Sequence, residues 1–482
     1  MKRKGLRVTA TTETTHADVI EWLEERQSRF VQMADTIWDH PELALAEFQA
    51  CRLQREDLKA DGFTISENIG DLPTAFMAEW TSGTGGPIIG FLGEYDALPS
   101  LSQGREPSQH PIVPDGPGHG CGHNLLGTAA LAAASVVRAW LEATGTPGTV
   151  RYYGCPAEET CEGKVFMARA EAFDDLDLAI TWHPNSTNTV WAGSSLAVNN
   201  IKFRFRGRTA HAASNPETGR SALDAVELMS VGVNYLREHV IDAARIHYVI
   251  TNGGGAPNVV PDDAEVWYFI RAPERWQVEE LTERVRKVAQ GAALMTETRL
   301  EEHFVSGAYN MLTNQLLSDQ LMSALDRLGP LEFTDEEVAY AREIADAFPE
   351  GLRRGVLSSD NLPESLMAEG LSGDVWPIRD AGKVLPGSTD VSDVSWITPT
   401  SQVTTACWPL AIPGHSWAIT ATAGVSIGHK GMIHAAKAMA ITASDFYLDP
   451  ELRAKARAEF EASTAGRPYQ CPIPAHVMPR KP

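Results

Sequence analysis

The chain has few basic residues for its length of 482: 41 Lys and Arg stand against 63 Asp and Glu, and the formal charge is −22. A nucleic-acid partner is therefore not expected, because neutralising phosphates requires clustered Lys and Arg. An anionic membrane surface is disfavoured for the same reason. With 43% hydrophobic and 22% charged residues, the composition is that of a folded globular protein and not of a disordered or fibrous one.

Cysteine and long apolar runs are also scarce. Six cysteines in 482 residues do not make the dense pattern of a disulfide framework, so we expect reduced thiols and a cytoplasmic protein. No uninterrupted run of about 18 apolar residues is present to span a bilayer. The N-terminus is basic, but no apolar segment follows it, so we expect a loose arm before residue 17 and no signal peptide.

Alternation of strand-like and helix-like segments predicts an α/β fold. Helical periodicity occupies residues 17–38, 43–62 and 125–145, and short apolar runs occupy 74–80, 87–95, 149–156 and 176–183. We expect a mixed sheet with helices on both faces, built from residues 17–196 and 308–482. From residue 197 to 307, a β-α-β-β-α-β pattern predicts a smaller inserted α+β domain.

Polar side chains of metal-ligand type follow several predicted strands, where open α/β sheets place their sites. The first cluster is Cys121 and His123, in a segment with glycine at positions 118, 120 and 122. A thiolate and an imidazole two residues apart suit zinc, manganese or a similar divalent ion, and the glycines permit a tight turn beside it. The alternative is a glycine-rich turn around a buried cysteine.

The second cluster is the pair Glu158 and Glu159, directly after the apolar run 149–156. Adjacent carboxylates in an extended segment point in opposite directions, so one can bind a metal while the other serves as a general base. For any Glu-Glu sequence, the alternative is a solvated pair at a strand end. The preceding apolar run and Pro156 favour the functional interpretation here.

Histidines complete the candidate set. His183 lies at the end of the predicted strand 176–183, although a single histidine can equally be structural. Of the late histidines, His434 lies in a helix-like run and His429 stands beside a lysine, whereas His415 lies in a loop and is better placed to bind a metal. Together, the five residues indicate a metal site more strongly than any one of them does alone.

Six segments together resemble the motifs of one enzyme family. They are GEYDALP (93–99), GHGCGHN (118–124), PAEET (156–160), WHPN (182–185), GSTDVSDVSW (387–396) and HKGM (429–432). The chain resembles the metal-dependent amidohydrolases, a family that contains aminoacylases, glutamate-releasing carboxypeptidases and auxin-conjugate hydrolases. The resemblance spans residues 20–450 and is closest to a branch of hydrolase subunits.

That resemblance implies a centre of two divalent ions, zinc or manganese. Carried over position by position, the implied metal ligands are Cys121, His123, Glu159, His183 and His415, and the implied catalytic base is Glu158. His415 is assigned because it precedes His434 by about the family's spacing. Many relatives have Asp where this chain has Asn124. The amide of Asn124 cannot supply the negative charge that an Asp carboxylate would place next to a metal ligand. The branch that the chain resembles also favours Asn at this position.

The inserted segment carries two further motifs, GRTAHAA at 207–213 and GGGAPNVVPD at 253–262. In the family these belong to a lid and dimerisation domain, so the resemblance implies a homodimer, with a heteromer of related subunits as the alternative. Asn258 and Arg271 are expected to hold the substrate carboxylate, since a guanidinium fork fits it in bidentate fashion. His211 is expected to reach the neighbouring chain's site. The alternatives are a surface position for Arg271 and local packing for His211.

The activity implied is hydrolysis of the amide bond of an N-acyl amino acid, with p-aminobenzoyl-glutamate or a related aryl or acyl conjugate as substrate. Two alternatives remain open: a dipeptidase for β-alanyl or basic dipeptides, and a subunit that is active only with a related partner chain. The complete ligand set and Glu158 argue against a purely structural subunit.

Overall fold

The structure is a computed structural model that describes residues 12–481. Helix α1 (Thr12–Asp39) begins five residues before the predicted start, so the expected loose arm is wrong for residues 12–16. The remainder of that predicted arm, residues 1–11, lies outside the described residues. Helix α2 (Phe48–Ala60) follows and lies within the helical segment predicted at 43–62.

The large domain is built on a seven-stranded sheet with the order β1-β2-β4-β3-β5-β11-β6. Its central strands are parallel: β4 (Gly148–Cys155), β3 (Ile88–Glu94), β5 (Leu178–Asn185) and β11 (Thr400–Ala406). The outer strands run antiparallel to their neighbours: β1 (Thr64–Glu67), β2 (Phe76–Ser82) and β6 (Thr189–Trp191). Parallel neighbours need crossover connections, and α3 (His123–Thr144) and α4 (Gly163–Arg169) provide them. The predicted mixed sheet is confirmed.

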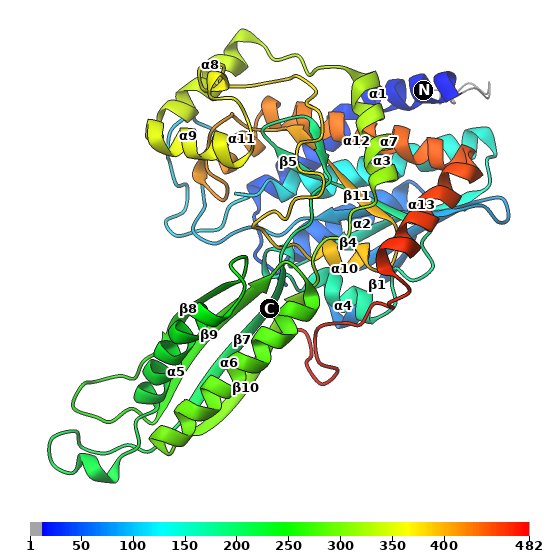
Figure 1. The fold of residues 1–482 in the computed structure, drawn as a ribbon. Helices are drawn as coiled ribbons and strands as arrows, with labels where there is room; N and C mark the ends of the chain where they lie inside the picture. The colour runs from blue at the N-terminus through cyan, green and yellow to red at the C-terminus, as the bar shows by residue number, and fades with distance from the viewer. Residues whose placement is uncertain (1–11, 482) are drawn as a thin grey trace.

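Helices cover both faces of this sheet (Figure 1). On one face α3 packs against α1 and α12 (Ser426–Leu448), and its many alanines permit close approach. On the other face α4, the short α10 (Val391–Ser395) and the C-terminal tail enclose a second cluster of apolar side chains. Of the described helices, α3 alone is long and apolar enough to cross a membrane, but 89% of its apolar window is buried, as expected for a core helix.

Five further helices complete the large domain: α7 (Gln315–Leu328), α8 (Asp335–Asp346), α9 (Glu350–Ser359), α11 (Trp417–Ala423) and α13 (Pro450–Thr464). Short 3-10 turns lie at Ile69–Asp71, Glu158–Thr160 and Glu364–Ala368. Residues 465–481 contain no helix or strand.

A four-stranded antiparallel sheet in the order β10-β7-β9-β8 forms an arm that projects from the large domain (Figure 1). Its elements are β7 (Ala197–Arg206), α5 (Ala222–Leu236), β8 (Arg245–Asn252), β9 (Asp263–Ala272), α6 (Arg275–Thr296) and β10 (Arg299–Ala308), with 3-10 turns at Pro216–Thr218 and Arg237–His239. The two helices and the sheet enclose their own apolar core. The predicted inserted α+β domain is confirmed, while its boundaries at 197 and 307, beside the start of β7 and the end of β10, stay predictions.

Candidate metal centre and active site

The candidate site lies at the carboxyl edge of the parallel strands. Glu94 is the last residue of β3, Cys155 is the last residue of β4, and His183 lies near the end of β5. Parallel strands point the same way, so these ends and the loops that follow them meet at one edge. His123 joins them as the first residue of α3, after Gly122, whose φ of 72° places it in the left-handed region that favours glycine.

All five predicted ligands come together there. Two groups form, in each of which the ligand atoms lie within 4.8 Å of one another: Cys121, His123 and His183 in one, and Cys121, Glu159 and His415 in the other. Cys121 Sγ lies 3.4 Å from His183 Nε2, and His415 Nε2 lies 3.6 Å from Glu159 Oε2. Atoms that bind one tetrahedral zinc ion at about 2.0–2.3 Å are separated by roughly 3.3–3.8 Å, so both separations fit a shared ion.

Unpartnered buried atoms also point to cations at this place. His123 Nε2 and Glu159 Oε1 are buried and have no hydrogen-bond partner. The donors are a thiol, imidazoles and a carboxylate, the set that zinc and related divalent ions prefer. Cys121 belongs to both groups, so its sulfur would be available to an ion held by either group. The residues present therefore fit a pair of divalent metal ions.

Hydrogen bonds at the Nδ1 atoms fix the orientation of the rings of His123 and His183. His123 Nδ1 lies 2.9 Å from Asp96 Oδ1, which directs Nε2 toward the centre. Asp96 Oδ2 also accepts the backbone N–H of Glu159 at 3.0 Å, so one buried carboxylate positions two predicted ligands. His183 Nδ1 bonds the carbonyl of Pro184 at 2.7 Å, leaving its Nε2 for the centre. Such partners behind metal ligands set the tautomer and the ring orientation.

Asp96 is a buried carboxylate of the candidate site that the sequence reasoning missed, although it lies inside the GEYDALP motif. The side chain at position 124, where many relatives have Asp, has a different role in the structure. Asn124 Nδ2 donates to the carbonyls of Ala423 at 3.0 Å and Ala34 at 3.3 Å, so its amide joins α3 to the neighbouring helices. The carboxylate behind His123 comes from Asp96 instead.

Glu158 and Glu159 lie in a 3-10 turn (Glu158–Thr160), so the expectation of an extended segment is wrong. The turn follows Ala157, whose φ is 56°. The two carboxylates nevertheless reach different groups: Glu159 lies with Cys121 and His415, while Glu158 lies with Glu94 and His123. Glu158 Oε2 is 4.0 Å from His123 Nε2. This places Glu158 beside the ligands but outside both groups that contain Cys121.

Burial and like charges shape the acidity of this cluster. Burial, with Glu94 and Asp390 nearby, raises the pKa of Glu158 well above its ordinary value. Burial also raises the pKa of Glu159 to about 7, and that of Cys121 to about 12. A divalent cation bound to these atoms would act in the opposite direction, because it stabilises the thiolate and the carboxylate forms.

The other late histidines lie away from the centre. His429 Nε2 is 3.2 Å from Asp35 Oδ1 at the surface of α1, and His434 is buried within α12. Neither belongs to a metal-type group among the described residues. Geometry thus brings His415 to the candidate ligands and leaves His429 out.

The predicted substrate-binding residues are spread along the arm. Arg271 is the penultimate residue of β9, and its neighbour Ala272 pairs with Ala197 where the arm meets the large domain. Asn258 lies beyond the other end of β9, where its carbonyl accepts the N–H of Ala212 at 3.0 Å. A ten-residue strand is about 30 Å long, so Asn258 and Arg271 of one chain do not meet.

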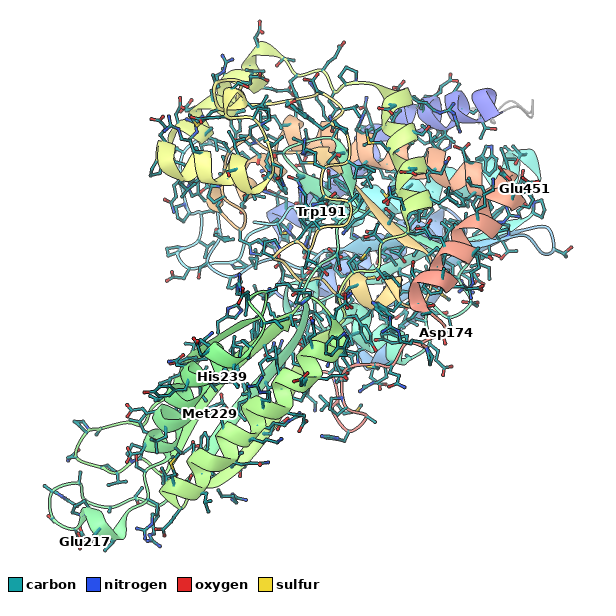
Figure 2. All side chains as sticks on the ribbon, in the orientation of Figure 1. Asp174, Trp191, Glu217, Met229, His239 and Glu451 are labelled. Atoms are coloured by element: carbon teal, nitrogen blue, oxygen red, sulfur yellow. The ribbon has the colours of Figure 1, made fainter. Side chains whose placement is uncertain are left out.

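His211 lies with Asn258 at the far end of the arm, where His211 and Val259 form an isolated bridge. Figure 2 labels Glu217 in this distal region, and Trp191 in the large domain, where its ring lies 5.2 Å from that of His183. The ring of His211 is exposed, and its Nδ1 accepts the backbone N–H groups of Ala213 and Ser214, both at 3.1 Å. The proton is therefore on Nε2, which is free to donate.

The outer edge of the arm is apolar. Large exposed side chains lie on the edge strand β8 and on the neighbouring helix α5: Leu228, Val231, Tyr235, Tyr248, Val249 and Ile250. Apolar patches of this kind on an unpaired strand edge favour association with another chain.

Cysteine, histidine and carboxylate side chains of metal-ligand type at the edge of a mixed α/β sheet, with an antiparallel arm inserted, are the arrangement of a metal-dependent hydrolase. Residues 197–296 match the family model described as the peptidase dimerisation domain, M20_dimer. The chain is 44% identical over 470 residues to the B-type subunit of p-aminobenzoyl-glutamate hydrolase from Escherichia coli (strain K12), covering 95% of this chain and 97% of that protein. The chain therefore belongs to the M20 family of metal-dependent amidohydrolases and peptidases, as its motifs predict.

More distant relatives and solved structures agree with this assignment. The Xaa-Arg dipeptidase of Mus musculus is 30% identical over 453 residues, covering 92% of this chain and 91% of that protein. A dinuclear metal-binding M20 peptidase of Bacillus subtilis has a TM-score of 0.57 at 19% identity, covering 87% of this chain and 98% of that chain. The aminobenzoyl-glutamate utilization protein of Klebsiella pneumoniae has a TM-score of 0.57 at 18% identity, covering 86% of this chain and 98% of that chain. At identities this low, the likeness to the two solved structures shows a shared fold and nothing more.

Proposed function

We propose that this chain hydrolyses the amide bond of N-acyl amino acids, with p-aminobenzoyl-glutamate or a related aryl or acyl conjugate as substrate. The observation that carries the proposal is the pair of ligand groups that share Cys121, with Glu158 directly beside them. The Escherichia coli relative, named for p-aminobenzoyl-glutamate, supports this substrate class. A cytoplasmic location is part of the proposal and is supported by six free cysteines.

The proposed metal ligands are Cys121, His123, Glu159, His183 and His415, and the ions are zinc or manganese. Bound there, the ions would supply Lewis-acid activation and lower the pKa of a water molecule. Glu158 takes a proton from the attacking water and passes it to the leaving amine, a role open to it because its carboxylate lies outside both groups that contain Cys121.

The proposed division of the chain follows the two sheets, with residues 17–196 and 308–482 as the catalytic domain and 197–307 as the lid and dimerisation domain. In a homodimer, Arg271 would bind the substrate carboxylate from the same chain, while Asn258 and His211 of the partner subunit would reach the site. Arg271 is suited to this role because its Nε is buried and has no hydrogen-bond partner. If a substrate with an amidated carboxyl group were cleaved at the same rate as the free acid, the proposed binding of the substrate carboxylate would be contradicted.

The test is an assay for release of the free amino acid from a panel of N-acyl amino acids that includes p-aminobenzoyl-glutamate. The protein is first stripped of metal and then supplied with zinc, manganese or cobalt. Glu158→Gln should keep its bound metal and lose most of its turnover. Glu162→Gln is a matched control, because Glu162 is a buried carboxylate of the same loop that pairs with Arg480, 2.6 Å away. Absence of hydrolysis with every substrate and metal would contradict the proposal, and so would a Glu158→Gln variant with wild-type turnover.

A dipeptidase is the second candidate, with β-alanyl or basic dipeptides as substrates. The observation that favours it is the 30% identity to the Xaa-Arg dipeptidase over nearly the whole chain. The same panel separates the two candidates once it includes β-alanyl and Xaa-Arg dipeptides. A higher kcat/KM for these dipeptides than for any N-acyl amino acid would favour the dipeptidase.

A requirement for a second, related chain is a further alternative. It is favoured by the relatives whose names describe them as subunits. One of these is the A-type subunit of p-aminobenzoyl-glutamate hydrolase from Escherichia coli (strain K12), which is 29% identical over 242 residues. The chain expressed alone should be sized by sedimentation and assayed with metal. Activity of the homodimer would exclude the requirement, whereas activity that depends on an added second chain would establish it.

A further inference from the structure

A lysine is completely buried behind the candidate metal centre. Lys164 lies in α4, and its side chain is 0% exposed. Its Nζ is 2.6 Å from Glu94 Oε1 and 2.6 Å from Asp390 Oδ1, and both carboxylate side chains are at most 3% exposed. Isolated ions are very unfavourable in such a place, so the three groups must keep one another charged.

The arrangement of this buried triad fixes the carboxylate of Glu94. Asp390 binds Lys164 twice, because its Oδ2 also accepts the backbone N–H of Lys164 at 2.8 Å. The ammonium is thereby anchored and draws one oxygen of Glu94 toward itself. The other oxygen, Oε2, is left facing His123 Nε2 at 3.4 Å. Two carboxylates and one ammonium leave the triad with one negative charge, on the side of the candidate centre.

The nitrogen that faces Glu94 is the one that the proposed metal site uses. His123 is 0% exposed, its Nδ1 bonds Asp96, and its Nε2 has no hydrogen-bond partner. Glu94, His123 and Glu158 form a third group whose ligand atoms lie within 4.8 Å of one another. The separation of 3.4 Å between Glu94 Oε2 and His123 Nε2 matches that of two atoms bound to one zinc ion, which is roughly 3.3–3.8 Å.

We propose that Glu94 is a further carboxylate ligand of the metal centre, on the His123 side, and that Lys164 and Asp390 position it. The inference rests on the proposed function, because it requires that His123 binds a divalent ion. The simpler alternative is that Glu94 serves only to neutralise Lys164. The two alternatives predict different zinc affinities once both charges of the Glu94–Lys164 pair are removed together.

The experiment is a titration of metal-stripped protein with Zn²⁺ in competition with a chromophoric chelator, which reports the number of bound ions and the affinity of each. Glu94→Gln should bind one of two ions at least about tenfold more weakly, the scale of loss found when groups that tune a metal site are removed. Asp393→Asn is the matched control, because Asp393 is equally buried on α10 but bonds Tyr469 instead of Lys164. It should bind both ions like the wild type.

The double variant Glu94→Gln with Lys164→Met distinguishes a ligand from a neutralising partner. It removes both charges and keeps similar side-chain volumes, so it should fold, as circular dichroism and thermal melting can verify. If Glu94 is a ligand, the double variant binds zinc as weakly as the single one. Affinity restored to the wild-type value, or a single variant with unchanged affinity, would overturn the inference. A wild-type chain that binds no metal would instead remove the proposed function itself.

Discussion

The carboxylate of Glu47 accepts the backbone N–H of Ala157 at 2.9 Å, although the two residues are 110 positions apart. Glu47 is completely buried, and the same oxygen accepts the N–H of Leu45 at 2.8 Å. Its other oxygen accepts the hydroxyl of Thr74 at 2.9 Å. Ala157 directly precedes Glu158 and has a left-handed φ of 56°. Glu47 therefore secures the start of the turn that presents both predicted catalytic-site carboxylates.

Replacing Glu47 should affect catalysis according to its hydrogen-bonding ability. In Glu47→Gln, the amide oxygen can accept both N–H groups and the amide nitrogen can donate to Thr74, so kcat should stay within a few-fold of wild type. Glu47→Leu leaves the N–H of Ala157 buried without a partner, which costs about 1–3 kcal/mol, and kcat should fall at least about tenfold while KM changes little. Steady-state kinetics on both variants is the measurement. Equal kcat in the two variants would contradict the positioning role.

Cys121→Ser should lower the metal content of the purified protein, because a hydroxyl is a far poorer ligand than a thiolate. Since Cys121 belongs to both ligand groups, the loss should affect both ions. Elemental analysis should find up to two divalent ions per chain in the wild type and fewer in the variant. Cys471→Ser is the control, because Cys471 is a half-buried cysteine of the C-terminal tail, and its metal content should equal that of the wild type.

Subunit mixing should reveal whether His211 acts across the dimer. Glu158→Ala chains and His211→Ala chains should each be inactive alone, because one lacks the base and the other a donor worth roughly 3–4 kcal/mol in the transition state. If His211 serves the neighbouring chain, mixed dimers contain one site with both groups intact, and partial activity returns. If it serves its own chain, the mixture stays inactive. Exchange of subunits must be verified separately, for example with differently tagged chains.

A charge on the edge strand β8 should dissociate the proposed dimer. Val249 is 55% exposed within the apolar patch of β8 and α5, so Val249→Asp would bury a carboxylate if this patch pairs with a second chain. Sedimentation velocity should show a shift from dimer toward monomer, and activity should fall with it. His303→Asp places the same charge on the exposed part of the opposite edge strand β10 and should leave the dimer intact. Dissociation by both variants would contradict the predicted interface.

His434 should make the protein less stable at mildly acidic pH. Burial lowers the pKa of His434 to about 4, from an ordinary value of 6.5. Between these two values the unfolded chain binds a proton that the folded chain excludes, so stability falls as the pH drops through this window. From pH 7 to pH 4.5 the loss from this residue is roughly 2–3 kcal/mol.

Urea unfolding at these two pH values provides the measurement. His434→Leu removes the titrating group and should reduce the difference in unfolding free energy between pH 7 and pH 4.5 by that amount. The exposed His303→Gln is the control and should keep the wild-type difference. An unchanged pH dependence in His434→Leu would mean that this histidine titrates alike in both states.

Local patterns were enough to predict most elements of the fold. Apolar runs identified β3, β4 and β5, because burial on both faces of a sheet leaves a direct record in the sequence. The short strand β1 was missed, since its side chains are largely exposed and carry no such record. The ligand residues were recognisable because Cys, His and Glu at strand ends are chemically distinctive.

Only the tertiary structure determined which side chains act together. No sequence pattern shows that Glu47, Glu94, Lys164 and Asp390 have buried partners, and these partners lie up to 226 positions away, as between Lys164 and Asp390. Asn258 and Arg271 are 13 residues apart, yet an extended strand separates them in space. Sequence patterns report the local choice between burial and exposure, whereas a buried ion pair or hydrogen bond depends on where distant segments meet, which the packing of the whole chain decides.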